Sequence, residues 1–295
     1  MKSGFVSIVG RPNVGKSTLI NKLINRKVAI VSDKSGTTRN NIYGIYNDED
    51  TQIIFVDTPG IGKLGTKLEQ LLNNKAYDAM ENDLVLFVVD IASGFGPNDK
   101  KILEKLKEDK KDVILILNKV DLISDKEKLL LEIDKLKDLY DFKEIIPISS
   151  LKDKDLDYVI DIIKKYLKDD IKYFDDDVVT NVSTEFMVAE IIREKLLLCT
   201  KDEVPHTITC VVENMKYKKD VVVIDGLIIV DRDNLKKIII GKNGSMLTKV
   251  GKMAREDIEE LLGKRVYLKL FVKVVNNWRD SSSKLKELGI DDLES

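Results

Sequence analysis

Residues 10–17 read Gly10-Arg11-Pro12-Asn13-Val14-Gly15-Lys16-Ser17, which is the phosphate-loop pattern G-x-x-x-x-G-K-[ST] without deviation. A short apolar run rich in β-formers, residues 5–9, precedes this loop. Residues 18–24 follow it with apolar side chains at helical spacing. The loop is therefore expected between a strand and a helix, which is the setting in which this pattern binds phosphate. We predict an α/β nucleotide-binding domain.

The residue types in this loop are those that a phosphate requires. The glycines let backbone N–H groups turn toward phosphate oxygens without interference from a Cβ atom. The following helix directs its positive dipole end at the same anion. We expect Lys16 to reach the β- and γ-phosphates and the Ser17 hydroxyl to bind Mg²⁺. All eight residues of the loop are predicted nucleotide contacts.

Composition limits the classes of protein that the chain can belong to. Its 295 residues, 43% of them hydrophobic, are enough for two domains with real cores. The net charge is only −2, so any basic surface for nucleic acid must be local. No run approaches the length of a membrane-spanning helix, and we expect no signal peptide before the first predicted strand. Cys199 and Cys210 lack ligand spacing, so we expect buried thiols in a reducing, cytoplasmic compartment.

Two later segments complete a site for magnesium and the γ-phosphate. The polar loop of residues 32–40 lacks periodicity, and its Thr38 is expected to give Mg²⁺ a second protein hydroxyl. Strand-like runs at residues 41–46 and 52–56 are separated by an acidic turn and predict a hairpin. The second run ends in Asp57-Thr58-Pro59-Gly60, where Asp57 is placed to hold Mg²⁺ through water and Gly60 to donate its N–H to the γ-phosphate. The predicted catalytic residues are Lys16, Thr38 and Gly60. The predicted nucleotide contacts of this segment are Asp57, Thr58, Pro59, Gly60 and Ile61.

A further motif is specific for the base. Residues 84–90 and 112–117 are continuous apolar runs, typical of strands buried on both faces of a mostly parallel sheet with helices on each side. The second run leads into Asn118-Lys119-Val120-Asp121. The Asp121 carboxylate can accept hydrogens from N1 and N2 of guanine, a pair that adenine does not offer. The wrong base would leave a charged acceptor unpaired, so this site predicts guanine selectivity.

Other residues are expected to support the base. Asn118 should tie its loop to the phosphate loop, and the aliphatic stem of Lys119 should cover one face of the base. Residues 146–150 end another strand at Ser149 and Ser150, where a backbone N–H is expected to meet guanine O6.

In order and position, the segments GRPNVGKS, GTTR, DTPG, NKVD and ISS resemble the motifs of the GTPase family. The resemblance covers residues 4 to about 168, and the GTTR and DTPG forms resemble the translation-associated branch. Ile61 departs from the Ras-like pattern, in which a glutamine orients the attacking water, so we expect slow intrinsic hydrolysis. The related branch uses an asparagine at the place of Asn13 to hold K⁺. Asn13 is therefore either a K⁺ ligand or a residue that bonds only within its loop.

The second half of the chain has a different organisation. Residues 1–170 form the predicted GTPase domain, and the acidic, aperiodic residues 171–182 form a predicted linker in which Tyr173 and Phe174 could pack on a neighbouring domain. A helix is predicted over residues 184–198 and strands over 207–212, 221–230 and 266–275, with a turn or bulge at Asp225-Gly226. A basic helix over residues 234–240 leads into the G-x-x-G loop Gly241–Gly244, and a second helix begins at Ser245.

This helix–G-x-x-G–helix arrangement beside a sheet resembles a KH domain of type II, a smaller α+β domain. The resemblance implies that the loop backbone approaches an RNA strand closely while bases enter a neighbouring apolar groove, which Ile238, Ile239 and Ile240 are expected to help build. Residues 231–279 contain twelve Lys or Arg and six Asp or Glu, an excess of six positive charges. The domain is predicted over residues 183–280, with a tail over 281–295. The predicted RNA contacts are Ile240, Gly241, Lys242, Asn243, Gly244 and Ser245.

A GTPase of this branch joined to a C-terminal KH domain resembles the Era family over essentially the whole chain. The resemblance implies a bacterial GTPase of ribosome assembly that binds the 30S subunit and its 16S ribosomal RNA near the 3′ end. It also implies GTP and GDP as substrate and product, Mg²⁺ with K⁺ as a second candidate cation, a monomer, and a cytoplasmic location with peripheral association to the inner face of the membrane. The competing hypothesis is an RNA-binding module whose nucleotide site is a sensor with negligible turnover. A tRNA-modifying relative is disfavoured, because those enzymes have a different partner domain and a reactive C-terminal cysteine.

Overall fold

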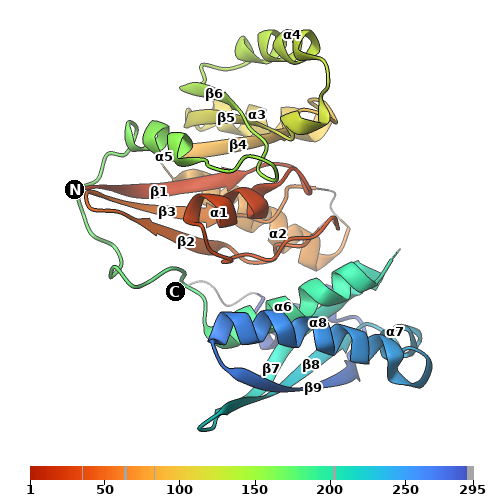
Figure 1. Cartoon of the computed structure of the whole chain (residues 1–295). Helices are drawn as coiled ribbons and strands as arrows, with labels where there is room; N and C mark the ends of the chain where they lie inside the picture. Colours follow the sequence, from red (N-terminus) through yellow and green to blue (C-terminus); the bar gives the residue numbers. More distant parts are fainter. Residues whose placement is uncertain (35, 63–64, 83, 202–203, 291–295) are drawn as a thin grey trace. The chain divides into compact units, whose positions relative to one another are not determined.

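The computed structural model describes residues 1–34, 36–62, 65–82, 84–201 and 204–290 (Figure 1). The chain forms two compact units. The first contains Met1–Val31, Thr38–Gly65 and Glu69–Asn181, and the second contains Ser32–Thr37, Thr66–Leu68 and Val182–Ser295. Each unit has its own sheet.

The first unit is built on a six-stranded sheet in the order β2-β3-β1-β4-β5-β6. Only β2 runs antiparallel to its neighbour, so the predicted hairpin and mostly parallel sheet are confirmed. Because the parallel strands end at one edge, the loops after β1, β3 and β5 meet there. The strands are β1 (Lys2–Val9), β2 (Ile42–Asn47), β3 (Thr51–Asp57), β4 (Leu84–Asp90), β5 (Asp112–Asn118) and β6 (Glu144–Pro147).

Helices cover both faces of this sheet. Alternate residues of β4 and β5, such as Phe87 and Leu115, share a core with residues of α2, α3 and α4, while α1 and α5 lie on the other face (Figure 1). Burial on both faces explains why β4 and β5 are continuous apolar runs. The helices are α1 (Lys16–Ile24), α2 (Lys67–Asp78), α3 (Pro97–Glu108), α4 (Lys126–Lys137) and α5 (Asp157–Lys164).

The segment predicted as a linker, residues 171–182, packs along the first unit as far as Asn181. Thr180 forms an antiparallel β-bridge with Gly44 of β2. The Tyr173 ring meets the Phe5 ring edge-on, with centroids 4.9 Å apart. Since β2 is the edge strand of the sheet, the segment covers backbone groups that would otherwise be exposed.

The second unit has a three-stranded sheet in the order β7-β8-β9, with β7 (Ile208–Tyr217) antiparallel to β8 (Val221–Val230) and β8 parallel to β9 (Arg265–Val274). Inward-facing residues of β8, such as Ile224 and Ile228, share a core with α6 and α8. The predicted order of elements is confirmed. The helices are α6 (Thr184–Cys199), α7 (Asp233–Ile240), α8 (Ser245–Leu262) and α9 (Ser282–Glu287).

The predicted interruption of β8 at Asp225-Gly226 is wrong. The strand runs straight through, and the irregularity lies in β7, where the register shifts between Val212 and Asn214 opposite these residues. A glycine is needed at position 226 for a different reason, because a Cβ added there would lie 2.9 Å from Cδ1 of Ile192 in α6. The glycine therefore allows a helix to pack closely on the sheet.

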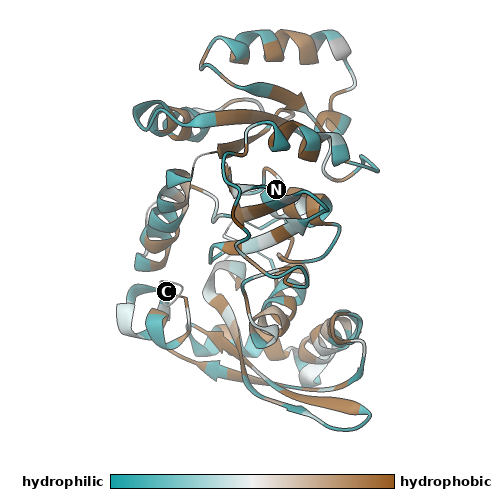
Figure 2. Ribbon diagram, turned by 90° about the vertical axis from the view of Figure 1, so that its left-hand side faces the viewer, coloured by the Kyte–Doolittle hydropathy of each residue, from teal (hydrophilic) through white to brown (hydrophobic). Residues whose placement is uncertain are grey.

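Short 3₁₀ helices occur at Ala79–Glu81, Val120–Leu122, Val204–Thr207, Lys242–Gly244 and Trp278–Asp280. Within the described residues, no helix combines the length and apolar character needed to cross a membrane. Hydropathy follows this architecture, with apolar residues along the strands and mixed colours on the helices (Figure 2). Cys210 is buried and Cys199 half-buried, both as free thiols. The predicted acidic end of the tail, residues 291–295, lies outside the described residues.

Candidate functional site

The phosphate loop has the backbone geometry that its glycines predict. Gly15 has a φ of 100°, and a Cβ added there would overlap the side-chain amide of Asn118. The next residue, Lys16, begins α1, and its ammonium donates to the carbonyl oxygens of Gly10 at 3.2 Å and Arg11 at 3.0 Å. The lysine therefore curls over the loop, where it can meet a phosphate chain.

The Lys16 ammonium is buried, and burial lowers its pKa from 10.5 to about 8. Attraction to Asp57 opposes part of this shift. An anion held in the loop would favour the charged form and raise the pKa again. A phosphate bound in the loop would therefore stabilise the charged form of Lys16.

The three predicted metal ligands converge. The Ser17 hydroxyl donates to Oδ2 of Asp57 at 2.8 Å, and the Thr38 hydroxyl lies 3.3 Å from that oxygen and 3.0 Å from the Ser17 hydroxyl. Oδ1 of Asp57 is buried and has no hydrogen-bond partner among the described residues. Burial raises the pKa of this carboxyl group, and Lys16 opposes the shift. A compact set of hard oxygen donors with one orphaned carboxylate oxygen fits Mg²⁺.

The DTPG segment packs tightly against the phosphate loop. A Cβ added at Gly60 would lie 2.7 Å from the backbone of Pro12. The next residue, Ile61, donates its backbone N–H to the Gly10 carbonyl at 3.3 Å, while its side chain is buried in the hydrophobic core. The position at which Ras-like GTPases carry a glutamine is therefore occupied by a core residue, and it offers no group to orient water.

Two predicted nucleotide contacts direct their side chains elsewhere. The Arg11 guanidinium forms an ion pair with Asp99 at 2.9 Å and donates to the Ser93 hydroxyl at 2.9 Å. The Thr58 hydroxyl is buried and donates to the Ile8 carbonyl at 2.8 Å. Arg11 can contribute its backbone to the phosphate loop, whereas the Thr58 side chain joins two strands.

The NKVD segment is tied to the phosphate loop as predicted. The Asn118 amide donates to the Val14 carbonyl at 2.7 Å. The Lys119 ammonium donates to the Asn13 carbonyl at 2.7 Å and to Asp90 at 2.8 Å, a partner that sequence reasoning missed. Burial alone would raise the pKa of Asp90, but its bonds to Lys119 and Ser93 lower it.

The Asp121 carboxylate, which we predict to accept from guanine, is held by the segment that follows β6. The Ser149 hydroxyl donates to Oδ1 of Asp121 at 2.6 Å. The backbone N–H groups of Ser149 and Ser150 donate to Asp153 at 2.7 Å and to Asn118 at 2.9 Å. Both amides are thus engaged within the loops, so a bond from either to guanine O6 remains a prediction that requires one of these bonds to be shared or exchanged.

The G-x-x-G loop of the second unit also depends on its glycines. Gly241, Asn243 and Gly244 all have positive φ angles, between 52° and 78°. A Cβ added at Gly241 would lie 2.8 Å from Cβ of Met246, whereas no atom of the described residues lies within 4 Å of one at Gly244. Gly241 is needed to form the turn, and the open side of Gly244 permits the close approach of a ligand backbone. The Lys242 side chain is exposed.

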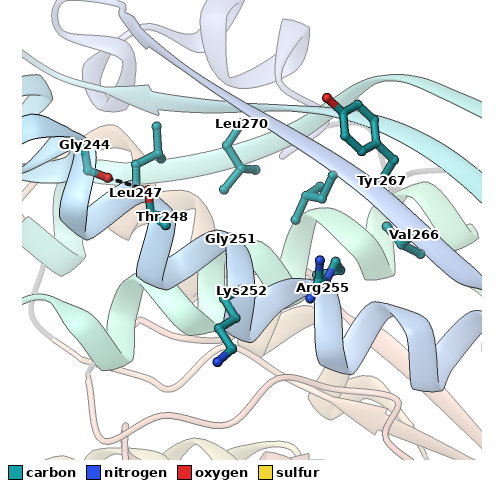
Figure 3. Close-up of a pocket in the computed structure, with 10 residues that line it drawn as sticks. Gly244, Leu247, Thr248, Gly251, Lys252, Arg255, Val266, Tyr267 and Leu270 are labelled. Atoms are coloured by element: carbon teal, nitrogen blue, oxygen red, sulfur yellow. Dashed lines mark hydrogen bonds between the residues drawn. The ribbon is translucent and has the colours of Figure 1, made fainter.

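A groove of about 570 Å³ begins beside this loop and runs between α8 and β9 (Figure 3). The prediction that Ile238, Ile239 and Ile240 help build this groove is wrong, because none of them is among its lining residues. Ile239 lies in the core and the Ile238 side chain is exposed. The lining residues are Gly244, Leu247, Thr248, Gly251, Lys252, Arg255, Val266, Tyr267, Leu268 and Leu270.

Comparison with known proteins places both sites in context. A model of the 50S ribosome-binding GTPase family matches residues 5–119, and a KH domain model matches residues 203–279. GTPase Era of Clostridioides difficile (strain 630) is 48% identical in an alignment of 298 positions that covers 99% of each chain.

Two solved structures are also similar over nearly the full chain. The first is an Aquifex aeolicus Era variant bound to GDP·AlF₄⁻, and the second is Era in complex with MgGDPNP and nucleotides 1506–1542 of 16S ribosomal RNA. Each has a TM-score of 0.94 and 41% identity, with 98% of this chain and 99% of the other covered.

Proposed function

The chain belongs to the Era family of GTPases, and on that premise we propose that it is a guanine-nucleotide switch that binds 16S ribosomal RNA near its 3′ end and acts in assembly of the 30S subunit. One observation carries the proposal: a single chain combines a complete nucleotide site with a G-x-x-G loop beside an open groove. The family structure that holds MgGDPNP and a 16S fragment together supports both ligands.

In the nucleotide site, each group has a defined task. Lys16 donates to the β- and γ-phosphates, and Asp121, oriented by Ser149, accepts from the guanine edge. Ser17, Thr38 and Asp57 would hold Mg²⁺, which when bound neutralises charge on the phosphates.

Intrinsic turnover should be slow, because the buried Ile61 cannot orient water. We propose K⁺ as a second cation, with the exposed Asn13 as its ligand in the phosphate loop. Turnover should be faster in potassium than in sodium, and Asn13→Ala should lose this difference while still binding GDP. Equal rates in the two salts for the unaltered chain would remove K⁺ from the proposal.

Two variants of the G-x-x-G loop test the RNA site. Lys242→Ala should weaken binding of RNA of any sequence by about two- to fivefold through loss of a phosphate contact. Gly244→Asp should abolish close approach of the strand. Gly289→Asp is a matched control, because Gly289 also has a positive φ, 67°, and no atom within residues 1–290 that the structure describes lies within 4 Å of a Cβ added there. Fluorescence anisotropy with a 3′-terminal 16S fragment measures all three, and unchanged binding by both loop variants would refute this site.

The competing hypothesis, a sensor with negligible turnover, also draws on the buried Ile61. Multiple-turnover hydrolysis with and without the 16S fragment separates the two. Stimulation by RNA supports the switch, and the absence of turnover in both conditions supports the sensor. In the switch, a GTP analogue should bind more tightly with RNA present, because coupling between two sites is reciprocal.

We further propose that the chain is a cytoplasmic monomer with peripheral association to the inner face of the membrane. The excess of positive charge over residues 231–279 supports attraction to anionic lipid headgroups. Light scattering tests the oligomeric state, and co-sedimentation with anionic vesicles at two salt concentrations tests the lipid contact.

A further inference from the structure

The edge strand β9 presents two chemically different faces. Val266, Leu268 and Leu270 face the helices and take part in the core or the groove. The alternate residues are exposed on the opposite face, and they read basic, aromatic, basic, aromatic, basic. In Figure 3 the Tyr267 ring lies on the side of β9 opposite Leu270 and Val266. We name these alternate residues the β9 outer face: Arg265, Tyr267, Lys269, Phe271 and Lys273.

The neighbouring strand β8 extends this face into alternating rows. Tyr267 pairs in register with Val223 of β8, and Phe271 pairs with Leu227, which gives two apolar rows with an aromatic ring at their edge. Between them lies a polar row in which the Lys269 ammonium is 3.9 Å from Asp225. Residues paired in register lie on one side of a sheet, so the rings and cations form one surface.

We propose that the β9 outer face is a second RNA-binding surface, on which bases of a single-stranded RNA stack on Tyr267 and Phe271 while the flanking cations contact phosphates. The inference rests on the proposed function, because the G-x-x-G loop and its groove would deliver the strand. It continues from the groove, whose lining includes Tyr267, onto the exposed side of β9, where recognition is by stacking and charge.

The rings have the exposure and spacing that stacking requires. Tyr267 is 57% exposed and Phe271 is 50% exposed. Four residues along a strand place them about 13 Å apart, a span that an extended RNA crosses in about two nucleotides. Exposed aromatic rings on a sheet are a recurrent platform for unstacked bases.

The charges complement a phosphate backbone. Arg265, Lys269 and Lys273 alternate with the rings, and Asp225 is the acidic residue beside them in the β8 row. The Lys269 ammonium lies 5.6 Å from the centre of the Tyr267 ring, so a base stacked on this ring would bring its phosphate near a cation.

Protection of the sheet edge explains only part of this pattern. Lysines on an edge strand oppose pairing with another chain. Two large, half-exposed aromatic side chains between them add apolar surface, which does not serve that purpose. Groove residues alternate with outer-face residues along β9. An RNA strand that leaves the groove across the edge of β9 would therefore reach the aromatic rings directly.

Two lengths of RNA separate the two surfaces. One probe is about 6 nucleotides long, enough for the groove, and the other is about 14 nucleotides long, both from the 3′ end of 16S ribosomal RNA and fluorescently labelled. For the full chain, Phe271→Ala should weaken binding of the longer probe by about fivefold or more, because a stacked ring contributes about that factor, and Tyr267→Ala with Phe271→Ala should weaken it by about 25-fold or more. Phe271→Ala alone should leave binding of the shorter probe unchanged, because Phe271, unlike Tyr267, is not among the residues that line the groove.

Matched variants keep the outcome specific. Tyr217→Ala removes a ring of equal exposure, 58%, on β7 and should change neither affinity. Tyr267→Phe should retain the affinity of the wild-type chain for the longer probe. Gly244→Asp should weaken binding of both probes. Unchanged binding by Gly244→Asp would count against the proposed function, whereas unchanged binding of the longer probe by the double variant alone would count against the β9 outer face.

Two results would overturn the inference. One is equal affinity of the double variant and the wild-type chain for the longer probe. The other is a loss by the double variant of binding to vesicles of anionic phospholipid with RNA affinity unchanged, which would make the face a membrane contact. A thermal melt should show that the double variant and Tyr217→Ala are folded, since the altered side chains are exposed.

Discussion

Affinity for GDP should fall as the pH rises from 7.0 to 8.5, because Lys16 loses its proton in this range when the phosphate site is empty. Burial lowers its pKa from 10.5 to about 8, and Asp57 opposes part of the shift. A bound β-phosphate places negative charge beside the ammonium and returns the pKa toward its ordinary range. The nucleotide therefore binds together with a proton when the free protein lacks one.

The size of this effect follows from the shifted pKa. With a pKa of about 8, the neutral fraction of Lys16 in the free protein is about one tenth at pH 7, one half at pH 8 and three quarters at pH 8.5. The affinity should then decrease about fourfold between pH 7.0 and 8.5, and binding at pH 8 should take up about half a proton.

Isothermal titration calorimetry at pH 8 in two buffers of different ionisation enthalpy measures the proton uptake directly. The series stops at pH 8.5 to stay below the titration of guanine N1. Asp57→Asn serves as an internal test, since removing the attraction of Asp57 should lower the pKa of Lys16 further and increase proton uptake at pH 7. A flat affinity from pH 7.0 to 8.5 with no uptake at pH 8 would refute the reasoning, because it would show that Lys16 stays charged in the empty site.

Three further variants test separate parts of the structure. Gly15→Ala should abolish GDP binding and lower the free energy of unfolding by about 2 kcal/mol, because a φ of 100° is strained for alanine and the added Cβ would overlap Asn118. The control in the same denaturant titrations is Gly94→Ala, where φ is 77° but no atom of the described residues lies within 4 Å of the added Cβ. Asp121→Asn replaces an acceptor by a group that also donates and should weaken GTP binding by about 2–3 kcal/mol relative to xanthosine triphosphate, as measured by competition. Trp278→Ala, which removes a fully buried indole and its bond to a backbone carbonyl, should lower the free energy of unfolding by about 3–5 kcal/mol with GDP affinity unchanged.

The convergence of the candidate nucleotide-site residues was predictable because phosphate and guanine chemistry restrict both residue type and position. Asp57 and Asn118 stand at the ends of β3 and β5, and a mostly parallel sheet brings such ends to one edge. The converging hydroxyl and carboxylate groups then follow from spacing, as the 2.8 Å bond between Ser17 and Asp57 shows. Few other arrangements of the same motifs would be compatible with this topology.

Side-chain directions were not predictable where the partner is distant in sequence and carries no motif. The guanidinium of Arg11 turns to Asp99, which also accepts from the backbone at the start of α3. Burial raises the pKa of Asp99, while Arg11 and the backbone bond oppose the shift. The packing of residues 171–181 on β2 has a similar origin, since an acidic segment without periodicity does not indicate which sheet edge it will cover.

The groove beside the G-x-x-G loop shows what periodicity can decide and what it cannot. Three consecutive isoleucines on a helix point about 100° apart, so Ile239 can enter the core only if Ile238 turns away from it. The residues of α8 that line the groove instead recur every three or four positions, as Leu247, Gly251 and Arg255 do, and this pattern was available in the sequence. Along β9 the alternation of apolar residues with rings and cations was equally visible. The alternation does not tell which face of the sheet α8 covers. The packing of α6 and α8 on the sheet decides that, so the proposed binding surface on the opposite face could be recognised only from the folded domain.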